Sequence, residues 1–415
     1  MTLIRIVRFR NLIAAAAALT AASCGPPSFD RAARQYIRLA VALGERDPDS
    51  IDFYYGPPEW VSDIRKNPPT LDQIRTSARR LEQQIKPDPR LRAQRMARQI
   101  DAIAARAEEL LGKSQSFDQR TREYFGLTVL PMDTGLGDET RAQLDGLLDG
   151  RGSLAARYAA FDAEFLVPPD RLPAVMARAV QGCRAQTRDH LRLPAGESVN
   201  IEYVHDKPWS AFSRYQGNFH SVIQVNADLE LTVDRALQLA CHEGYPGHHT
   251  QNILQDVQLV RDQHRMEWTV QPTFSPQSLV SEALATFAVN VAFPGKERMR
   301  FERDALFPLA GLDPARAAKY DRVERLVDQL QSAEPAIARD FLDGKLEWAR
   351  AAAALEQQAL MFHPEQTLKY INEYRAYMIT YTVGPELVAR QVSDWPQFAS
   401  LLTDPNAAQR IIMKP

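Results

Sequence analysis

Apolar residues recur every three or four positions along most of this chain, which is the spacing of amphipathic helices. Early in the chain the pattern runs through Arg31–Glu45, Leu71–Lys86 and Leu91–Leu111. Proline-containing breaks separate these runs, at Gly56–Pro58, Asn67–Pro69 and Lys86–Pro89. A polar break at Met132–Glu139 precedes a second helical block, and most of the chain after Leu231 is again helical. The pattern therefore predicts a mainly α protein.

One segment breaks the helical pattern. Ser221–Asn226 is short, rich in β-branched residues and preceded by Gly217, so we predict a strand and with it a small β-sheet. It ends sixteen residues before His242. Two interpretations stay open: an edge strand to which an extended peptide could add, or a buried strand with no ligand.

The N-terminus is typical of an export signal. Arg5, Arg8 and Arg10 precede an alanine-rich run, Leu12–Ala22, that is too short to span a bilayer. Ala21-Ala22-Ser23-Cys24 is similar to a bacterial lipobox, which predicts a signal peptide at 1–24 and a lipid on Cys24. Ordinary signal cleavage is the alternative. Either way we expect an extracytoplasmic protein, and Gly25 after the cysteine favours the outer membrane, facing the periplasm.

Composition excludes some partners. The net charge of the 415-residue chain is -2, so no basic surface predicts nucleic-acid binding, and no protein partner can be inferred. We expect an N-terminal helical region at 25–131 and a catalytic region at 132–415, or one continuous domain. Beyond Cys24, Cys183 and Cys241 could pair in an oxidising compartment, but we expect Cys241 to be a buried thiol instead.

The residues most suited to metal binding and catalysis are concentrated in one octapeptide, His242-Glu243-Gly244-Tyr245-Pro246-Gly247-His248-His249. It holds three of the eight histidines. Imidazole is a common zinc ligand, and a glutamate beside a ligating histidine is the usual general base of zinc hydrolases. We therefore expect His242 to bind Zn²⁺ and Glu243 to act as the base. Imidazole and carboxylate also suit Mn, Co or Fe.

The second ligand does not follow the common spacing, because position 246 is proline. Seven residues of unbroken helix rise about 10.5 Å, too far for two imidazoles to share one ion. Pro246-Gly247 must therefore break the helix. We favour His248 as the second ligand, with His249 as the alternative; the other histidine would contact substrate or brace the site.

A third ligand would complete a catalytic site that still leaves one position for water. Ser275-Pro276 predicts a helix start, and Glu282 on that helix is a lone carboxylate among apolar and small residues. A buried carboxylate needs a partner. We expect Glu282 to be the third ligand of one zinc ion per chain.

These residues together resemble a known family. His242-Glu243-x-x-Pro246-Gly247-His248-His249-x-Gln251 is similar to the signature of the bacterial family labelled domain of unknown function 885. The resemblance spans roughly Glu202 to Arg390 and includes three further segments: Val225-Asn226, Glu282-Ala283-Leu284-Ala285 and Tyr381-Thr382-Val383-Gly384.

The resemblance implies a helical, zincin-like zinc peptidase of the gluzincin type that cleaves short peptides. It further implies that Tyr381 stabilises the oxyanion, with a purely structural core tyrosine as the alternative. This chain departs from the family where Ala283-Leu284 replaces Gly-Trp and where Tyr377 stands for glutamine, so its substrate pocket could differ.

We expect Asn226, Tyr245 and His249 to contact substrate, and His205, Tyr215 and His220 either to line the cleft or to be structural. Two other functions stay open. One is a zinc amide hydrolase acting on cell-wall or modified amino-acid substrates. The other is a non-catalytic, metal-binding lipoprotein.

Overall fold

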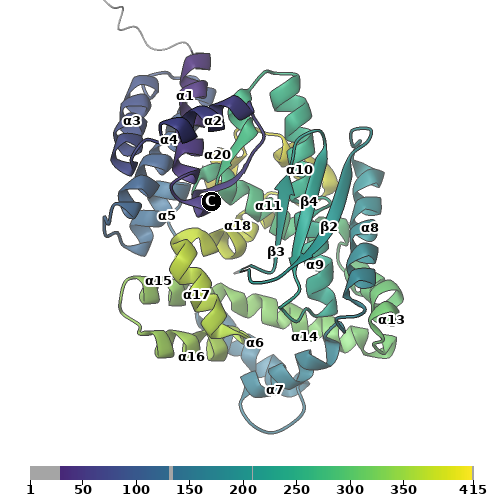
Figure 1. Cartoon of the computed structure of the whole chain (residues 1–415). Coiled ribbons are helices and arrows are strands. Elements are labelled where there is room, and N and C mark those ends of the chain that lie inside the picture. The colour runs from purple at the N-terminus through teal and green to yellow at the C-terminus, as the bar shows by residue number, and fades with distance from the viewer. Residues whose placement is uncertain (1–28, 130–133, 208, 414–415) are drawn as a thin grey trace, which may run out of the picture.

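The computed structural model describes residues 29–129, 134–207 and 209–413. Helices dominate it and the strands form two small sheets, so the predicted mainly α fold with a small β-sheet is confirmed (Figure 1). The export signal and Cys24 lie outside the described residues and stay predictions.

The N-terminal helices gather at one corner of the molecule, in purple and blue in Figure 1. Their bounds are α1 (Phe29–Gly44), α2 (Pro58–Lys66), α3 (Leu71–Ile85), α4 (Leu91–Leu110) and α5 (Phe117–Phe125). The three predicted helical runs of this region are confirmed in α1, α3 and α4, to within two residues at each end. At α3, Thr70 and Gln73 form a reciprocal capping box that satisfies two otherwise unpaired N–H groups. Apolar faces of α1, α3 and α4 form one hydrophobic cluster.

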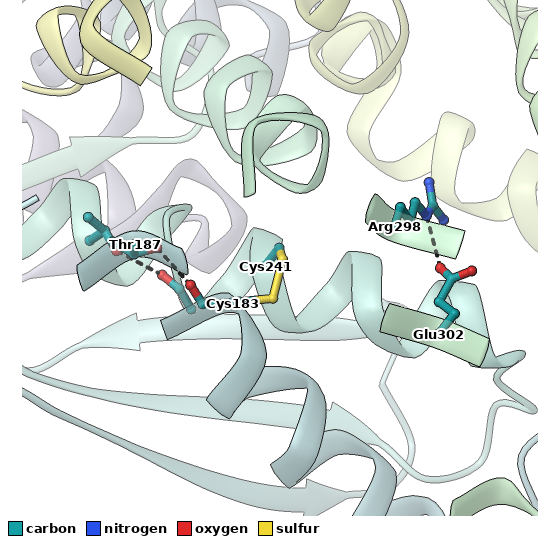
Figure 2. Close-up of a disulfide and its surroundings, with 7 residues drawn as sticks. Cys183, Thr187, Cys241, Arg298 and Glu302 are labelled. Carbon is teal, nitrogen blue, oxygen red and sulfur yellow. Dashed lines mark hydrogen bonds and ion pairs between the residues drawn. A yellow bond between two sulfur atoms is a disulfide. The ribbon is translucent and has the colours of Figure 1, made fainter. Parts of the chain in front are cut away.

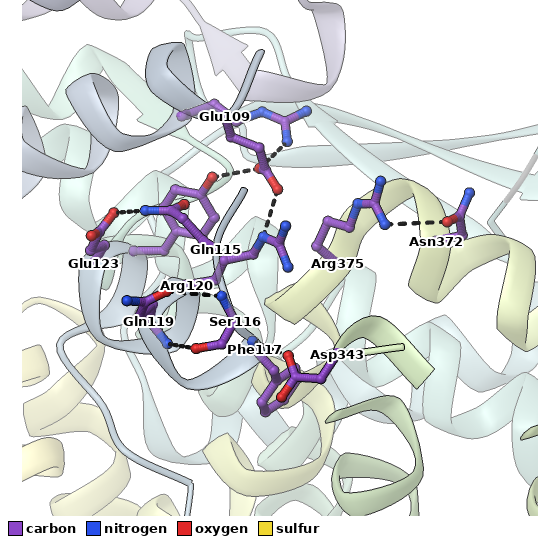
Figure 3. A network of polar contacts seen from close by, with 12 residues as sticks. Glu109, Gln115, Ser116, Phe117, Gln119, Arg120, Glu123, Asp343, Asn372 and Arg375 are labelled. Carbon is purple, nitrogen blue, oxygen red and sulfur yellow. Dashed lines mark hydrogen bonds and ion pairs between the residues drawn. The ribbon is translucent and has the colours of Figure 1, made fainter. Parts of the chain in front are cut away.

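Helix α5 joins this region to the rest of the molecule through polar contacts (Figure 3). Glu109 accepts hydrogen bonds from Arg106, Arg120 and the Tyr124 hydroxyl. The Phe117 N–H donates to Asp343, 226 positions later, at 2.7 Å. Because α5 also contributes apolar side chains to the second, larger hydrophobic cluster, it packs with the main body.

The remaining helices follow in the main body. Before the sheet they are α6 (Thr134–Leu147), α7 (Leu154–Asp162) and α8 (Leu172–His190). After it they are α9 (Val233–Glu243), α10 (His248–Gln255), α11 (Pro276–Ala292), α12 (Glu297–Phe301), α13 (Phe307–Ala310), α14 (Ala317–Leu330), α15 (Glu334–Leu342), α16 (Trp348–Ala359), α17 (Pro364–Tyr374), α18 (Ile379–Ala389), α19 (Trp395–Leu402) and α20 (Ala407–Met413). Helix α6 begins at Thr134, inside the stretch expected to be a polar break.

Strand β4 (His220–Asn226) confirms the predicted strand, but it lies in the middle of its sheet. Strand β2 (Ser198–Val204) pairs with it in parallel and β3 (Ala211–Tyr215) pairs antiparallel on its other side. Both edges of β4 are therefore occupied, and the edge-strand interpretation is wrong. Strands β1 (Ile51–Tyr54) and β5 (Val270–Pro272) form a second, antiparallel sheet that joins the N-terminal region to the segment before α11.

Cys183 on α8 and Cys241 on α9 form a disulfide, so the expectation of a buried free thiol at Cys241 is wrong (Figure 2). Their Cα atoms lie 5.4 Å apart, within the usual range for a disulfide. Successive residues of a helix point about 100° apart. Cys241 therefore faces α8 while His242 faces elsewhere.

Among the described residues, no single helix is long and apolar enough to cross a membrane. By length and composition alone, the bent pair formed by Pro276–Ala292 and Glu297–Ala310 passes the same test together.

Candidate metal centre

The centre begins where α9 ends. Apolar residues hold α9 in the core, and Gly244 ends it with its N–H still bonded to the Ala240 carbonyl at 3.1 Å. The chain then reverses through Pro246 and Gly247, and the Gly247 N–H donates to the Cys241 carbonyl at 3.0 Å. Helix α10 starts at once with His248. The predicted helix break at Pro246-Gly247 is confirmed, and it returns His248 to the side of His242.

Three side chains from three helices meet at one point. The Nε2 atoms of His242 and His248 lie 3.1 Å apart. Each lies 3.3 Å from a different oxygen of Glu282, which projects from α11. All three residues are less than a tenth exposed, and one ligand atom from each lies within 4.8 Å of the others.

The donor set fits a tetrahedral metal ion. Ligands about 2.0–2.2 Å from a tetrahedral zinc lie roughly 3.3–3.5 Å from one another, close to the separations found here. Glu282 Oε2 is buried, and apart from the His242 imidazole 3.3 Å away it has no partner among the described residues. A buried carboxylate oxygen with so few partners is costly, and a cation would satisfy it.

Hydroxyl groups behind the imidazoles orient the rings. His248 Nδ1 lies 3.2 Å from the Ser281 hydroxyl, and His242 Nδ1 lies 3.4 Å from the Thr286 hydroxyl. A proton on each Nδ1 would leave both Nε2 lone pairs directed at the shared point. The Ser281 hydroxyl donates to Gln251 at 2.8 Å, which leaves its oxygen free to accept from His248.

Charge distribution also suits a cation. Burial opposes ionisation of Glu282, but the imidazoles of His248 and His242 outweigh it and hold the Glu282 pKa well below its usual range. Burial would lower the pKa of His248, yet the Glu282 carboxylate raises it to about 9. Without a metal, a proton on His248 balances the carboxylate, so a metal ion would have to displace that proton.

Two further residues expected at the centre lie beside it. Glu243 is 4% exposed, and its Oε1 lies 3.9 Å from His242 Nε2. Tyr381, in the first turn of α18, places its ring 6.1 Å from the His242 ring and is 37% exposed. Desolvation and the Glu282 charge raise the Tyr381 pKa well above 10, so its phenol stays protonated and can donate a hydrogen bond.

Three residues expected to contact substrate do not face the centre. His249 is fully buried, with Nδ1 2.8 Å from the Ser221 hydroxyl and Nε2 3.2 Å from Glu197. Tyr245 is also buried and donates its hydroxyl to Glu197. Asn226 is buried and donates its side-chain amide to the backbone carbonyls of Lys207 and Trp209, in the loop between β2 and β3. Their polar atoms are already paired with protein, so all three brace the scaffold, and His249 lies outside the metal cluster.

The remaining candidates also bond within the scaffold. Tyr215 donates its hydroxyl to Asp256 at 2.7 Å. His205 pairs with Asp228, and His220 lies 3.0 Å from the Ser198 hydroxyl. We therefore interpret Tyr215, His205 and His220 as structural residues.

Sequence reasoning noted Tyr377 only as a departure from the family and missed its role, which is to donate its hydroxyl to Glu282 Oε1 at 3.1 Å. It also missed the roles of Ser281 and Thr286. Thr286 lies four residues after Glu282 on α11, so the helical period placed both on one face and was the available signal. Nothing local identified Tyr377, because it comes from the far end of the chain.

Comparisons with known proteins do not assign this chain to a family. No protein-family model matches it, and no curated protein matches it. The putative lipoprotein from Colwellia psychrerythraea is 13% identical with a TM-score of 0.49, over 92% of this chain and 76% of that one. A putative lipoprotein of unknown function from Shewanella oneidensis is 12% identical with a TM-score of 0.46, over 94% of this chain and 79% of that one. We therefore base function on the geometry of the centre.

Proposed function

We propose that this protein is an extracytoplasmic, zinc-dependent hydrolase that cleaves short peptides, anchored by a lipid on Cys24. The observation that carries the proposal is the donor set itself. Two imidazole nitrogens and one carboxylate oxygen converge at metal-ligand spacing, and that oxygen has no other partner among the described residues. Three protein ligands would leave a fourth position open, as catalytic zinc sites require.

His242, His248 and Glu282 would hold the ion, which when bound supplies a Lewis acid that activates water near neutral pH. Glu243 follows His242 directly, and its carboxylate accepts no hydrogen bond within the described chain and lies 3.9 Å from His242 Nε2, so it is available as a general base. It would accept the proton of the attacking water and pass it to the leaving amine. Tyr381 would donate its phenolic hydrogen to the carbonyl oxygen as negative charge develops there.

A zinc amide hydrolase acting on cell-wall or modified amino-acid substrates would use the same groups. A non-catalytic metal site is favoured by one observation, the near-complete burial of Glu243 and all three candidate ligands. The number of candidate ligands argues against a structural zinc site, because such sites usually have four protein ligands and this centre has three.

Substitution of Glu243 by Gln separates these alternatives. We expect E243Q to keep its zinc and to lose turnover of a fluorogenic short-peptide library by roughly 10²-fold or more. Glu356→Gln, an exposed glutamate on α16, is the matched control and should behave as wild type. Zinc binding by the wild type without turnover of any peptide would favour the amide hydrolase or the non-catalytic site. Loss of zinc in E243Q would contradict the assignment of Glu243 as the base.

A further inference from the structure

An arginine shares the helix face of the first candidate ligand. Arg235 lies in the first turn of α9, seven residues before His242. Seven residues are close to two full turns, so both side chains leave the helix on the same side, about 10.5 Å apart along its axis. Arg235 is solvent-exposed, whereas its neighbour Ala236 is buried.

The guanidinium of Arg235 has unused donors. Its hydrogen bond in the described chain goes to the side chain of Gln238, one turn further along α9. No carboxylate among the described residues lies within ion-pair distance of it. Asp234, the adjacent acid, is instead engaged by Arg298 and by the Tyr320 hydroxyl. An arginine carries five N–H donors in a fork that matches a carboxylate, and most of them remain available here.

Arg235 lies close enough to the candidate metal centre to feel the charge of Glu243. It is accessible to solvent, yet enough protein surrounds it that desolvation lowers its pKa, while the charges of Asp234 and Glu243 act against that effect. Tyr381 has the same combination, being 37% exposed although desolvation raises its pKa. The side of α9 that carries His242 therefore has two solvent-accessible side chains beside it, Arg235 and Tyr381.

We infer that Arg235 binds the C-terminal carboxylate of a short peptide, an inference that rests on the proposed function and narrows its substrate class. An extended peptide advances about 3.3 Å per residue. The rise from His242 to Arg235 therefore corresponds to roughly three residues. A bidentate pair with a carboxylate would compensate the partly desolvated guanidinium, which has no acidic partner of its own. Substrates should accordingly be peptides that end about three residues from the metal.

Binding in a background that cannot turn over tests this inference. Zinc-loaded E243Q protein would be titrated calorimetrically with N-acetylated tetrapeptides, each as the free acid and as the C-terminal amide. We expect the free acids to bind roughly tenfold or more tightly than the amides, as charge-assisted hydrogen bonds imply. Arg235→Met should abolish the difference, and R235K should restore part of it, because lysine keeps the charge without the fork. Arg80→Met, an exposed arginine on α3, is the matched control.

Each outcome decides the matter. Preference for free acids that is lost in R235M and kept in R80M supports the inference. Equal binding of acids and amides, an R235M protein that still prefers acids, or no binding of any peptide overturns it. The proposed function is tested separately with the wild-type protein: free acids that bind but are never cleaved would end the hydrolase proposal and leave a carboxylate-binding site. Equal cleavage of free acids and amides would support the hydrolase proposal and overturn the inference about Arg235.

Discussion

Glu282 depends on a neighbour that lies 95 positions later in the chain. Tyr377 is buried and donates its hydroxyl to Glu282 Oε1 at 3.1 Å, while the Ser278 hydroxyl lies 3.2 Å from the same phenol. Groups behind a metal ligand fix its orientation, and their loss typically weakens metal binding by 10- to 100-fold. Tyr377 therefore acts as a positioning residue for the carboxylate.

Removing this hydroxyl should weaken metal binding without unfolding the protein. We expect Tyr377→Phe to raise the dissociation constant for zinc by roughly tenfold, measured by competition with a chelator of known affinity. The melting temperature of the metal-free protein should stay within a few degrees of wild type, because the ring still fills its space. Ser278→Ala, which touches the phenol but not Glu282, is the control. Unchanged zinc affinity in Y377F would show that Glu282 needs no such support.

At the residue scale, the sequence predicted which residues could bind a metal ion better than it predicted where their side chains point. It identified His242, His248 and Glu282, which the structure brings together. It favoured His248 but left His249 open as the alternative, because that choice depends on how the chain reverses at Pro246-Gly247. The reversal directs His249 toward Ser221 and Glu197 and leaves His248 facing His242.

The junction between α9 and α10 allows no side chain at Gly247. A Cβ atom there would lie 1.9 Å from the His242 carbonyl oxygen and 2.5 Å from that of Cys241. Both contacts are with backbone, which cannot rotate away. The junction therefore holds the two imidazoles at their short separation only while residue 247 is glycine.

Gly247→Ala should push α10 away from α9 and separate His242 from His248. We expect this variant to lose stoichiometric zinc and to melt at a lower temperature, because the clash must be relieved by moving one helix. Mass spectrometry of metal content and a thermal melt would measure both effects. Gly146→Ala lies in open space on α6 and should bind zinc normally, with equal or slightly higher stability. Normal zinc content in G247A would refute this account of the junction.

At the element scale, helices with clear periodicity and the buried strand β4 could be predicted, whereas the more exposed strands could not. α1, α3 and α4 follow the sequence pattern closely. β2 and β3 were missed because each is less buried than β4 and its identity depends on pairing with β4. The Cys183–Cys241 disulfide was considered but a free thiol was preferred, since the pattern of α9 alone does not reveal that α8 packs against Cys241.

At the scale of the whole molecule, distant segments join the N-terminal region to the body that carries the centre. β1 pairs with β5, and buried Glu267 accepts hydrogen bonds from Arg92 and Arg95 of α4. These contacts lie just before α11 in the chain, and α11 presents Glu282. No periodicity could predict them, because each joins residues more than 170 positions apart.

Metal content tests the central claim most directly. The chain lacking residues 1–24 would be purified, exposed to Zn²⁺, passed over a desalting column and analysed by mass spectrometry beside His242→Ala. We predict about one zinc per chain in the parent, a matching rise in its melting temperature, and loss of both in H242A. A folded parent protein without stoichiometric metal would contradict the claim that His242, His248 and Glu282 form a metal centre.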